Sequence, residues 1–299
     1  MGGRPLREHG EILSYEEILA VVEAAVGIGI SKIRITGGEP LVRRKIVTFC
    51  QMLADTKGIE SVAITTNGIL LPSLAKPLAD AGVKRINISL DTMQPERFKQ
   101  ITGADQLDKV LDGINQAERA GLAPLKINMV VMRGINDDEI EDFVRLAFEK
   151  PYQIRFIELM PTDGWAADKH RNLFMPVTEI IERVRGIGNL EATDADAHFG
   201  PAQVYSLPGA KGKVGFIAPL SRHFCGVCNR LRLTADGQIK PCLFSDDEID
   251  LKVALRKGAS KAQLTEIFKT AVSRKPLGHK LNQGDEQKAV GRGMQAIGG

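Results

Sequence analysis

Three cysteines and two arginines lie within one short segment, residues 223–244, which reads HFCGVCNRLRLTADGQIKPCLF. Cys225 and Cys228 form a Cys-x2-Cys pair, which presents two thiolates to one ion from a tight turn. A hairpin turned by Asp236-Gly237 is predicted to bring Cys242, on the return strand, to the same point. The spacing therefore predicts a metal site.

Three sulfur ligands leave one coordination position of the metal open. On zinc a fourth protein ligand usually fills that position, and His223 is the candidate here. On a 4Fe-4S cluster the open position leaves one iron free to bind a substrate. The spacing of the cysteines does not choose between zinc and iron.

Arg230 and Arg232 alternate on the strand predicted after Cys228, so their side chains point the same way. Two fixed guanidinium groups beside a metal site suit a phosphate ligand. The alternative is a solvated strand face, because surface arginines are common.

The composition is that of an ordinary globular protein, with 299 residues, 43% of them hydrophobic and 26% charged. A net charge of +3 is too small to indicate nucleic acid binding, and no apolar run is long enough to span a membrane. We therefore expect a cytoplasmic protein. Four cysteines, three of them clustered, favour metal binding over disulfides, and Cys50 is predicted to be a buried thiol.

Short β-branched runs alternate with amphipathic runs between residues 30 and 161, as in a parallel sheet built from strand–helix units. Two of the predicted helices cover residues 16–26 and 137–148. The five predicted strands cover residues 32–36, 61–67, 85–91, 125–132 and 154–160. Their spacing is typical of a (β/α) barrel or a doubly wound sheet.

Polar residues alternate with apolar ones along these strands, so one face of the sheet is polar. A closed eight-stranded barrel fills its interior with aliphatic side chains, so a polar interior predicts an incomplete, wider barrel that holds a charged ligand. A solvent-exposed face of an open sheet is the less favoured alternative. The polar positions are Arg34, Thr36, Thr65, Asn67, Asn87, Ser89, Asp91, Lys126 and Asn128.

Polar loops are predicted at the carboxyl ends of three of these strands, where ligands bind in such folds. They are Thr36-Gly37-Gly38-Glu39-Pro40, Thr66-Asn67-Gly68 and Ser89-Leu90-Asp91. The first of them alone is as compatible with a tight turn that has no ligand.

The pattern changes after Pro161. A helix is predicted over 178–185 and hairpin strands over 203–207, 214–218, 231–234 and 238–244. We therefore divide the chain into a partial barrel, 1–161, and a C-terminal α+β region, 162–299, whose polar segment from residue 273 has no periodicity.

The motifs ITGGEPLVRR, AITTNG, NISLDT, NMVVMRGIND, RFIELMP, CGVCNRLRLTADG and a terminal IGG occur in this order. Together they resemble the molybdenum cofactor biosynthesis protein A family, the radical S-adenosylmethionine enzymes that act as GTP 3',8-cyclases. GGEP is shared with other radical S-adenosylmethionine enzymes. The cysteine hairpin with NRLRL and the final Gly-Gly narrow the resemblance to this family.

The resemblance implies an incomplete six-stranded (β/α) barrel with two 4Fe-4S clusters. One cluster binds and reductively cleaves S-adenosylmethionine, and the resulting 5'-deoxyadenosyl radical takes a hydrogen from C3' of GTP. The C3' carbon then bonds to C8 of guanine.

The resemblance also implies a role for individual residues. Cys225, Cys228 and Cys242 would hold the second cluster, whose free iron meets guanine. The contacts to GTP would come from Arg34, Thr65, Lys126, Arg230, Leu231 and Arg232. Those to S-adenosylmethionine would come from Gly38, Ser89 and Met160, and Gly298-Gly299 would form a tail that enters the active site.

One departure from the family concerns the first cluster. The family places Cys-x3-Cys-x2-Cys after its first barrel strand, and this chain has no cysteine before Cys50. We therefore expect a shortened chain that lacks the first strand and the ligands of the first cluster, and that is inactive alone. The edge of the strand at 32–36 would be uncovered and prone to association, for instance as a homodimer.

Two other classes of protein are alternatives to the enzyme. One is a GTP-binding iron-sulfur or zinc module without catalysis, and the other is a structural zinc-ribbon adaptor that binds no GTP. The partners expected for the enzyme are GTP, S-adenosylmethionine and an electron donor whose identity the sequence does not give.

Overall fold

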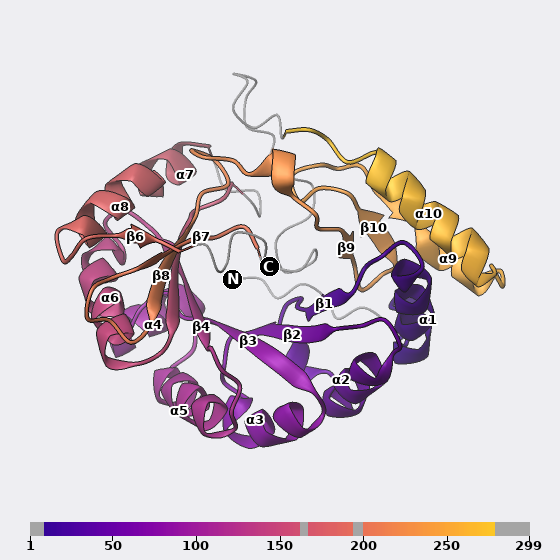
Figure 1. Ribbon diagram of the computed structural model, residues 1–299, viewed down its shortest axis with the longest axis horizontal. Helices are drawn as coiled ribbons and strands as arrows, with labels where there is room; N and C mark the ends of the chain where they lie inside the picture. The colour runs from indigo at the N-terminus through magenta and orange to yellow at the C-terminus, as the bar shows by residue number, and fades with distance from the viewer. Residues whose placement is uncertain (1–8, 162–166, 194–199, 279–299) are drawn as a thin grey trace.

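The computed structural model describes residues 9–161, 167–193 and 200–278, which form a curved β-sheet with helices on its outer side (Figure 1). The sheet strands are β1 (Lys32–Ile35), β2 (Ser61–Thr66), β3 (Val83–Ser89), β4 (Lys126–Val131), β5 (Gln153–Glu158), β6 (Glu191–Ala192), β7 (Gln203–Ser206) and β8 (Lys213–Ile217). The helices are α1 (Tyr15–Val26), α2 (Ile46–Asp55), α3 (Leu71–Asp80), α4 (Pro95–Thr102), α5 (Leu107–Arg119), α6 (Ile140–Glu149), α7 (Ala167–Leu173), α8 (Val177–Arg185), α9 (Leu251–Arg256) and α10 (Lys261–Ser273).

The strand order is β1-β2-β3-β4-β5-β8-β7-β6. Pairing is parallel from β1 through β5 to β8, and antiparallel for β8–β7 and β7–β6. This is an incomplete (β/α) barrel with a hairpin added at one side, so the predicted fold class is confirmed.

The five predicted strands and the three predicted helices all form, and their ends shift by at most about three residues. The start of α1 shows why the sequence sets such a boundary. The Ser14 hydroxyl accepts from Glu17 N at 3.1 Å, and the Glu17 carboxylate accepts from Ser14 N at 2.7 Å. This reciprocal capping satisfies two backbone donors that a helix start leaves without partners.

The prediction for β8 needs a correction. The segment 214–218 was assigned to hairpin strands of a separate C-terminal region, and it does pair with β7. However, β8 also pairs in parallel with β5, for example Ile154 with Val214, so it is the sixth parallel strand of the barrel. The sheet thus continues past residue 161, and the division of the chain at that residue stays a prediction.

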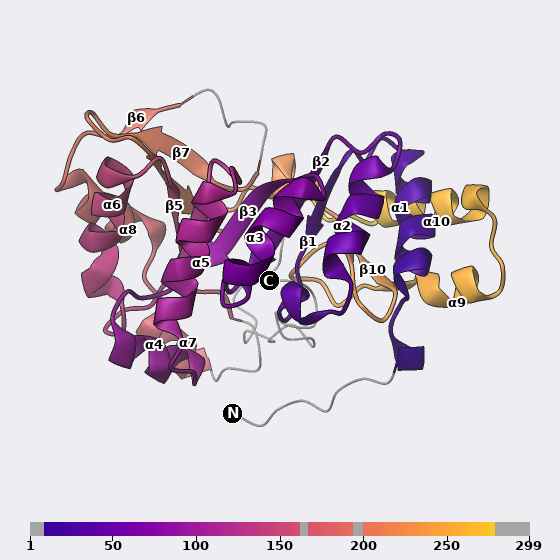
Figure 2. The same cartoon turned by 90° about the horizontal axis from the view of Figure 1, so that it is seen from below.

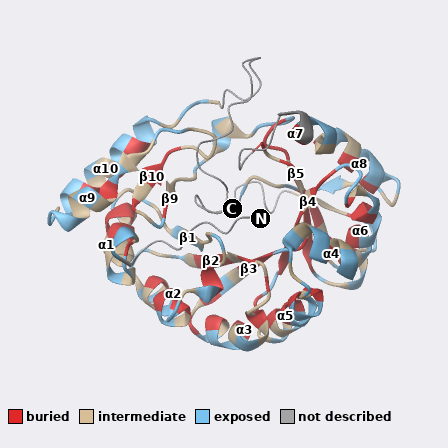
Figure 3. Cartoon of the chain, turned by 180° about the vertical axis from the view of Figure 1, so that it is seen from behind, coloured by how far each residue is buried: buried red, intermediate tan, exposed pale blue. Residues whose placement is uncertain are grey.

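Alternation along the strands separates an apolar outer face from a polar inner face. Ile86 and Ile88 of β3 are fully buried under the helices, whereas Asn87 lies between them on the opposite face. Figure 1 shows the helices α2, α3, α5, α6 and α8 outside the curved sheet, and Figure 3 shows the buried residues concentrated between the two layers. The inner face, called the lumen below, is therefore the polar one.

The C-terminal part forms a small sheet of β9 (Arg232–Leu233), β10 (Gln238–Lys240) and β11 (Ile249–Asp250), covered by α9 and α10. A second apolar core joins it to α1, through side chains that include Val21, Ile239 and Phe268. Figures 1 and 2 show α9 and α10 beside α1, next to the β1 end of the barrel. The cysteine segment is thus anchored beside the edge of the main sheet.

The hairpin is shorter than predicted. Its turn forms at Gly237, whose φ of +81° suits glycine, but β10 ends at Lys240. Cys242 therefore follows the return strand instead of lying on it, and Pro241 stands between them. Arg230 likewise precedes β9, which begins at Arg232.

The described residues contain no helix that is long and apolar enough to cross a membrane. The predicted tail residues Gly298 and Gly299 lie outside the described residues.

Candidate functional site

Register places the predicted strand residues in rows across the lumen. Thr65 pairs with Asn87, Asn87 with Lys126, and Lys126 with Gln153. Because residues that pair in register point to the same face, these four side chains form one row. The Asn87 amide also donates to the Thr65 hydroxyl at 3.1 Å. The structure thus brings Thr65 and Lys126 to the same wall, about two strand spacings (~10 Å) apart.

Arg34 of β1 lies close to the arginines of the cysteine segment. Burial by the surrounding barrel wall lowers the pKa of Arg34, and the charges of Arg230 and Arg85 lower it further. Burial also lowers the pKa of Arg232, to about 10, with further lowering by Arg230 and Arg34 that the thiols of the cysteine segment partly oppose. Residues predicted from two distant segments therefore converge as one cationic cluster.

The side chain of Arg34 keeps contact with solvent in the lumen although protein surrounds it. Among the described residues, no carboxylate forms an ion pair with Arg34. A cluster of cations that repel one another is costly to hold without an anion. The arrangement therefore suits a multiply charged anion in the lumen.

The three cysteines share this neighbourhood. A 3-10 turn, Cys225–Val227, carries the Cys-x2-Cys pair, and Cys228 N donates to Cys225 O at 3.1 Å. Burial raises the pKa of Cys228, but the amide and charge of Arg230 outweigh it, so the pKa is lowered. A lowered pKa favours the thiolate, which is the form that binds metals.

No three metal-binding side chains of the described residues stand close enough together to hold an ion as they are placed. The donor set nevertheless fits an iron-sulfur cluster or zinc in its chemistry, since all three thiols are free and partly accessible. His223, the candidate fourth ligand for zinc, is exposed. Binding of a metal by Cys225, Cys228 and Cys242 stays a prediction.

The residues predicted to contact S-adenosylmethionine lie at one edge of the sheet, at the carboxyl ends of parallel strands. Gly38 follows β1, Ser89 ends β3, and Met160 follows β5. Beside Gly38, the Glu39 carboxylate accepts from the Thr66 hydroxyl and from Asn67 N, each at 2.7 Å. Glu39 thus ties the loop after β1 to the loop after β2.

Asp91, next to the same edge, has a raised pKa. Burial raises its pKa to about 6, and a hydrogen bond from Val130 N at 2.8 Å opposes the rise only in part. The Asn136 amide fixes the backbone of this turn by donating to Asp91 O at 2.7 Å. Asp91 therefore gains or loses a proton near neutral pH.

Two lumen residues of β5 were not predicted from the sequence. Gln153 and Arg155 are each 4% exposed, and Arg155 donates to the Gln153 side chain at 3.0 Å. Arg155 pairs in register with Asn128, so it adds a cation to the next row of the lumen. The signal was present in QIRFIE, where Gln153 and Arg155 alternate with Ile154 and Phe156.

A third missed residue, Glu158, lies on the outer face of β5 and is fully buried. Its carboxylate accepts hydrogen bonds from Val177 N at 2.8 Å, Leu220 N at 3.0 Å and Ser221 N at 3.1 Å, and from the Ser221 hydroxyl. Glu158 therefore joins β5 to the start of α8 and to the segment that leads into the cysteines.

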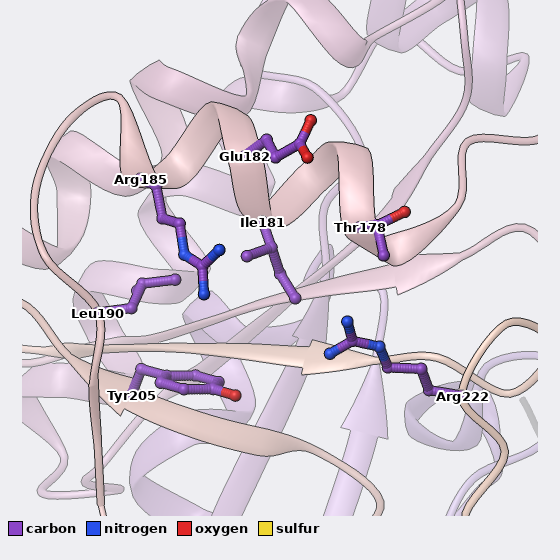
Figure 4. A pocket seen from close by; sticks show the side chains of 7 residues that line it. All are labelled: Thr178, Ile181, Glu182, Arg185, Leu190, Tyr205 and Arg222. Carbon is purple, nitrogen blue, oxygen red and sulfur yellow. The ribbon is translucent and has the colours of Figure 1, made fainter.

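A separate pocket of about 140 Å³ lies between α8 and β7, where Arg185 and Arg222 approach the ring of Tyr205 (Figure 4). None of the predicted site residues lines this pocket. A second pocket, lined by residues of α1 and α2, contains none of them either. The candidate site is thus the lumen and its cationic rim.

Comparison with known proteins connects both halves of the chain to one chemistry. Residues 3–147 match the Radical SAM superfamily, and residues 152–281 match the Molybdenum Cofactor Synthesis C family. A GTP 3',8-cyclase of Alkaliphilus oremlandii is 48% identical over 98% of this chain and 89% of its own length. A GTP 3',8-cyclase of Moorella thermoacetica is 50% identical over 99% of this chain and 90% of its own length.

The fold is also that of a solved structure. The crystal structure of Streptococcus suis SuiB bound to S-adenosylmethionine matches 88% of this chain with a TM-score of 0.61. The identity is 15%, and this chain spans 62% of the SuiB chain, so the likeness concerns the fold alone.

Proposed function

This chain belongs to the GTP 3',8-cyclase family of radical S-adenosylmethionine enzymes in molybdenum cofactor biosynthesis, and we propose that its lumen binds the substrate GTP. The observation that carries this proposal is the convergence of Arg34 with Arg230 and Arg232. The pKa values of Arg34 and Arg232 are lowered, in part by the charge of Arg230. A triphosphate would neutralise this cluster.

The remaining lumen residues fit the same ligand. Lys126, 6% exposed, and Arg155, 4% exposed, add two cations to the wall opposite β1. Thr65 lies in the same row of the lumen as Lys126, and Leu231 lies between Arg230 and Arg232 in the chain; both would contact the nucleotide. Guanidinium groups bind phosphate oxygens in pairs, so the arginines would fix the position as well as the charge of the triphosphate.

We further propose that Cys225, Cys228 and Cys242 hold one 4Fe-4S cluster next to GTP, with its open position toward guanine. The fourth cysteine, Cys50, is fully buried in the apolar core, and burial raises its pKa to about 12, which disfavours the thiolate that binds metals. A zinc site with His223 is the alternative. Metal analysis after anaerobic purification separates them: about four irons per chain support the cluster, and one zinc contradicts it.

S-adenosylmethionine would bind at the carboxyl edge of the sheet, near Gly38, Ser89 and Met160. In this family a bound 4Fe-4S cluster supplies the electron that cleaves S-adenosylmethionine. The 299 residues offer three usable thiols, which suffice for one cluster of the two. We therefore propose that this polypeptide alone does not complete the reaction.

The test is conversion of GTP in the presence of S-adenosylmethionine and a reductant. The 299-residue polypeptide is compared with a version extended at its N-terminus by a segment that bears Cys-x3-Cys-x2-Cys. We expect cyclised GTP from the extended version only. If the extended version binds two clusters and forms no cyclised GTP, the proposed activity is wrong; turnover by the 299 residues alone would refute the need for further thiols.

A further inference from the structure

The ladder between β9 and β10 ends just before the cysteines. Its register pairs Leu233 with Ile239 and Arg232 with Lys240. β9 begins at Arg232 and β10 ends at Lys240, so Leu231 and Pro241 lie beyond the ladder. The two arms that carry the cysteines therefore leave the small sheet at this point.

Lys275, in the segment that follows α10, binds both arms at this point. Its Nζ atom donates to Arg230 O at 2.7 Å and to Pro241 O at 3.0 Å. Arg230 belongs to the arm with Cys228, and Pro241 immediately precedes Cys242. An ammonium group carries three donors and can satisfy two carbonyl oxygens at once, which a backbone amide cannot do as well.

Further contacts fix the parts on either side of the bridge. The guanidinium of Arg230 lies 5.1 Å from the centre of the Phe224 ring, so Arg230 is held by its side chain as well as by its carbonyl. On the other arm, the fully buried Lys240 donates to Ser245 O at 2.7 Å and to Glu248 at 3.0 Å. Between these fixed parts, the two hydrogen bonds of Lys275 connect the arm that carries Cys228 to the arm that carries Cys242.

We infer that Lys275 is a positioning residue that sets the separation of the two cysteine arms and directs Arg230 toward the lumen. The inference rests on the proposed function for the identity of the metal cluster and of the nucleotide. It does not require Lys275 to touch either of them.

The test compares Lys275→Met, Lys275→Arg and a control, Lys269→Met. Lys269 lies on α10 and pairs with Glu266 on the exposed surface, so its removal leaves the two arms unchanged. Each protein is reconstituted with iron and sulfide without oxygen. The readouts are the rate of iron release to a ferrous chelator, the dissociation constant of GTP without turnover, and the temperature of unfolding.

We expect Lys275→Met to release iron about tenfold faster and to bind GTP about tenfold more weakly, because two hydrogen bonds from a charged donor are lost. Lys275→Arg keeps the charge and several donors, so it should recover part of both properties. Lys269→Met should match the wild type. Wild-type iron release and GTP affinity in Lys275→Met would overturn the inference.

A wild-type protein that holds no iron and binds no GTP would refute the proposed function. The role of Lys275 in joining the two arms would then be tested by a separate measurement. Amide hydrogen exchange is measured over residues 229–231 and 242–245 of the metal-free protein. Faster exchange in Lys275→Met than in the wild type and Lys269→Met supports the bridge. Equal exchange in all three proteins overturns it.

Discussion

At the scale of single residues, the cations of the lumen act on one another. The charge of Arg230 lowers the pKa of both Arg34 and Arg232 in addition to the effect of burial, and the charge of Arg34 lowers the pKa of Arg232. A bound triphosphate would oppose these effects, because an anion favours the charged form of each guanidinium.

Substitution of Arg232 by Gln tests its part in GTP binding. We expect the dissociation constant of GTP to rise about tenfold or more, since a charge-assisted contact is lost. Denaturant titration shows whether the substitution also affects folding. The measurements are GTP titration and denaturant titration, with Arg145→Gln as the control because Arg145 lies on the exposed face of α6 beside Asp142. Unchanged GTP affinity in Arg232→Gln would contradict a role in the site.

Asp91 predicts a pH dependence of stability. Burial raises its pKa from the ordinary 3.8 to about 6, so between these pH values the folded state binds a proton that the unfolded state has lost. Its contribution is therefore complete below about pH 4 and is lost as the pH rises through about 6.

The side chain of Asn in Asp91→Asn cannot ionise, so the variant should not lose this stability as the pH rises. Denaturant titrations of the metal-free protein at pH 4.5 and pH 7.5 measure the difference in unfolding free energy between variant and wild type. We expect the difference to favour the variant more at pH 7.5. A difference that is the same at both pH values would show that Asp91 does not titrate as described.

The sequence predicted which strand residues face the lumen, because strand alternation is a local pattern. Lys126 and Thr65 share the inner face with Arg34, as their spacing predicted, and Asn87 donates to Thr65 within one row. Arg155 follows the same rule and was overlooked. The bridging role of Lys275 could not be predicted, because the carbonyls that it binds are 45 and 34 residues away in the chain.

At the scale of elements, one carboxylate joins three segments. Glu158 of β5 accepts three backbone hydrogen bonds, from the start of α8 and from the segment after β8, and one from a hydroxyl. Because the Glu158 carboxylate and its hydrogen bonds with Val177 N and Leu220 N are buried, these two amides would lack a strong acceptor if the charge were removed.

We expect Glu158→Gln to lower the free energy of unfolding by about 3 kcal/mol, as is typical when a buried charged acceptor loses its charge. The control is Glu141→Gln on the exposed side of α6, which should change it by about 0.5 kcal/mol or less. Denaturant titration measures both. Equal stability of the two variants would mean that Glu158 does not hold these segments together.

The elements that the sequence did not predict depend on contacts across long distances in the chain. The sequence predicts the strand β8 but not its parallel pairing with β5. Four elements, α7, α8, β6 and β7, lie between these two strands in the chain, so no local pattern indicates that they are neighbours. The helix α10 was missed although Leu264, Phe268 and Ala271 recur at helical spacing, so the signal was available. The return strand ends at Lys240, whereas the predicted hairpin extended it beyond Cys242.

At the scale of the whole molecule, the C-terminal part brings the cysteines and arginines to the edge of the barrel. The second core, formed by α1, α10 and the small sheet, fixes this position. Arg34 on β1 and Arg232 on β9 are nearly 200 residues apart in the chain, and they meet only in this arrangement. The candidate site is therefore shared between the barrel and the C-terminal part.

The central claim is that the lumen recognises a triphosphate. Binding of GTP, GDP, GMP and guanosine to the anaerobically reconstituted protein tests it most directly, because guanine is common to all four and cancels in the comparison. We expect affinity to fall with each phosphate removed, and guanosine to bind about 100-fold more weakly than GTP or worse, since several charge-assisted contacts disappear. Equal affinities for GTP and guanosine would contradict the claim.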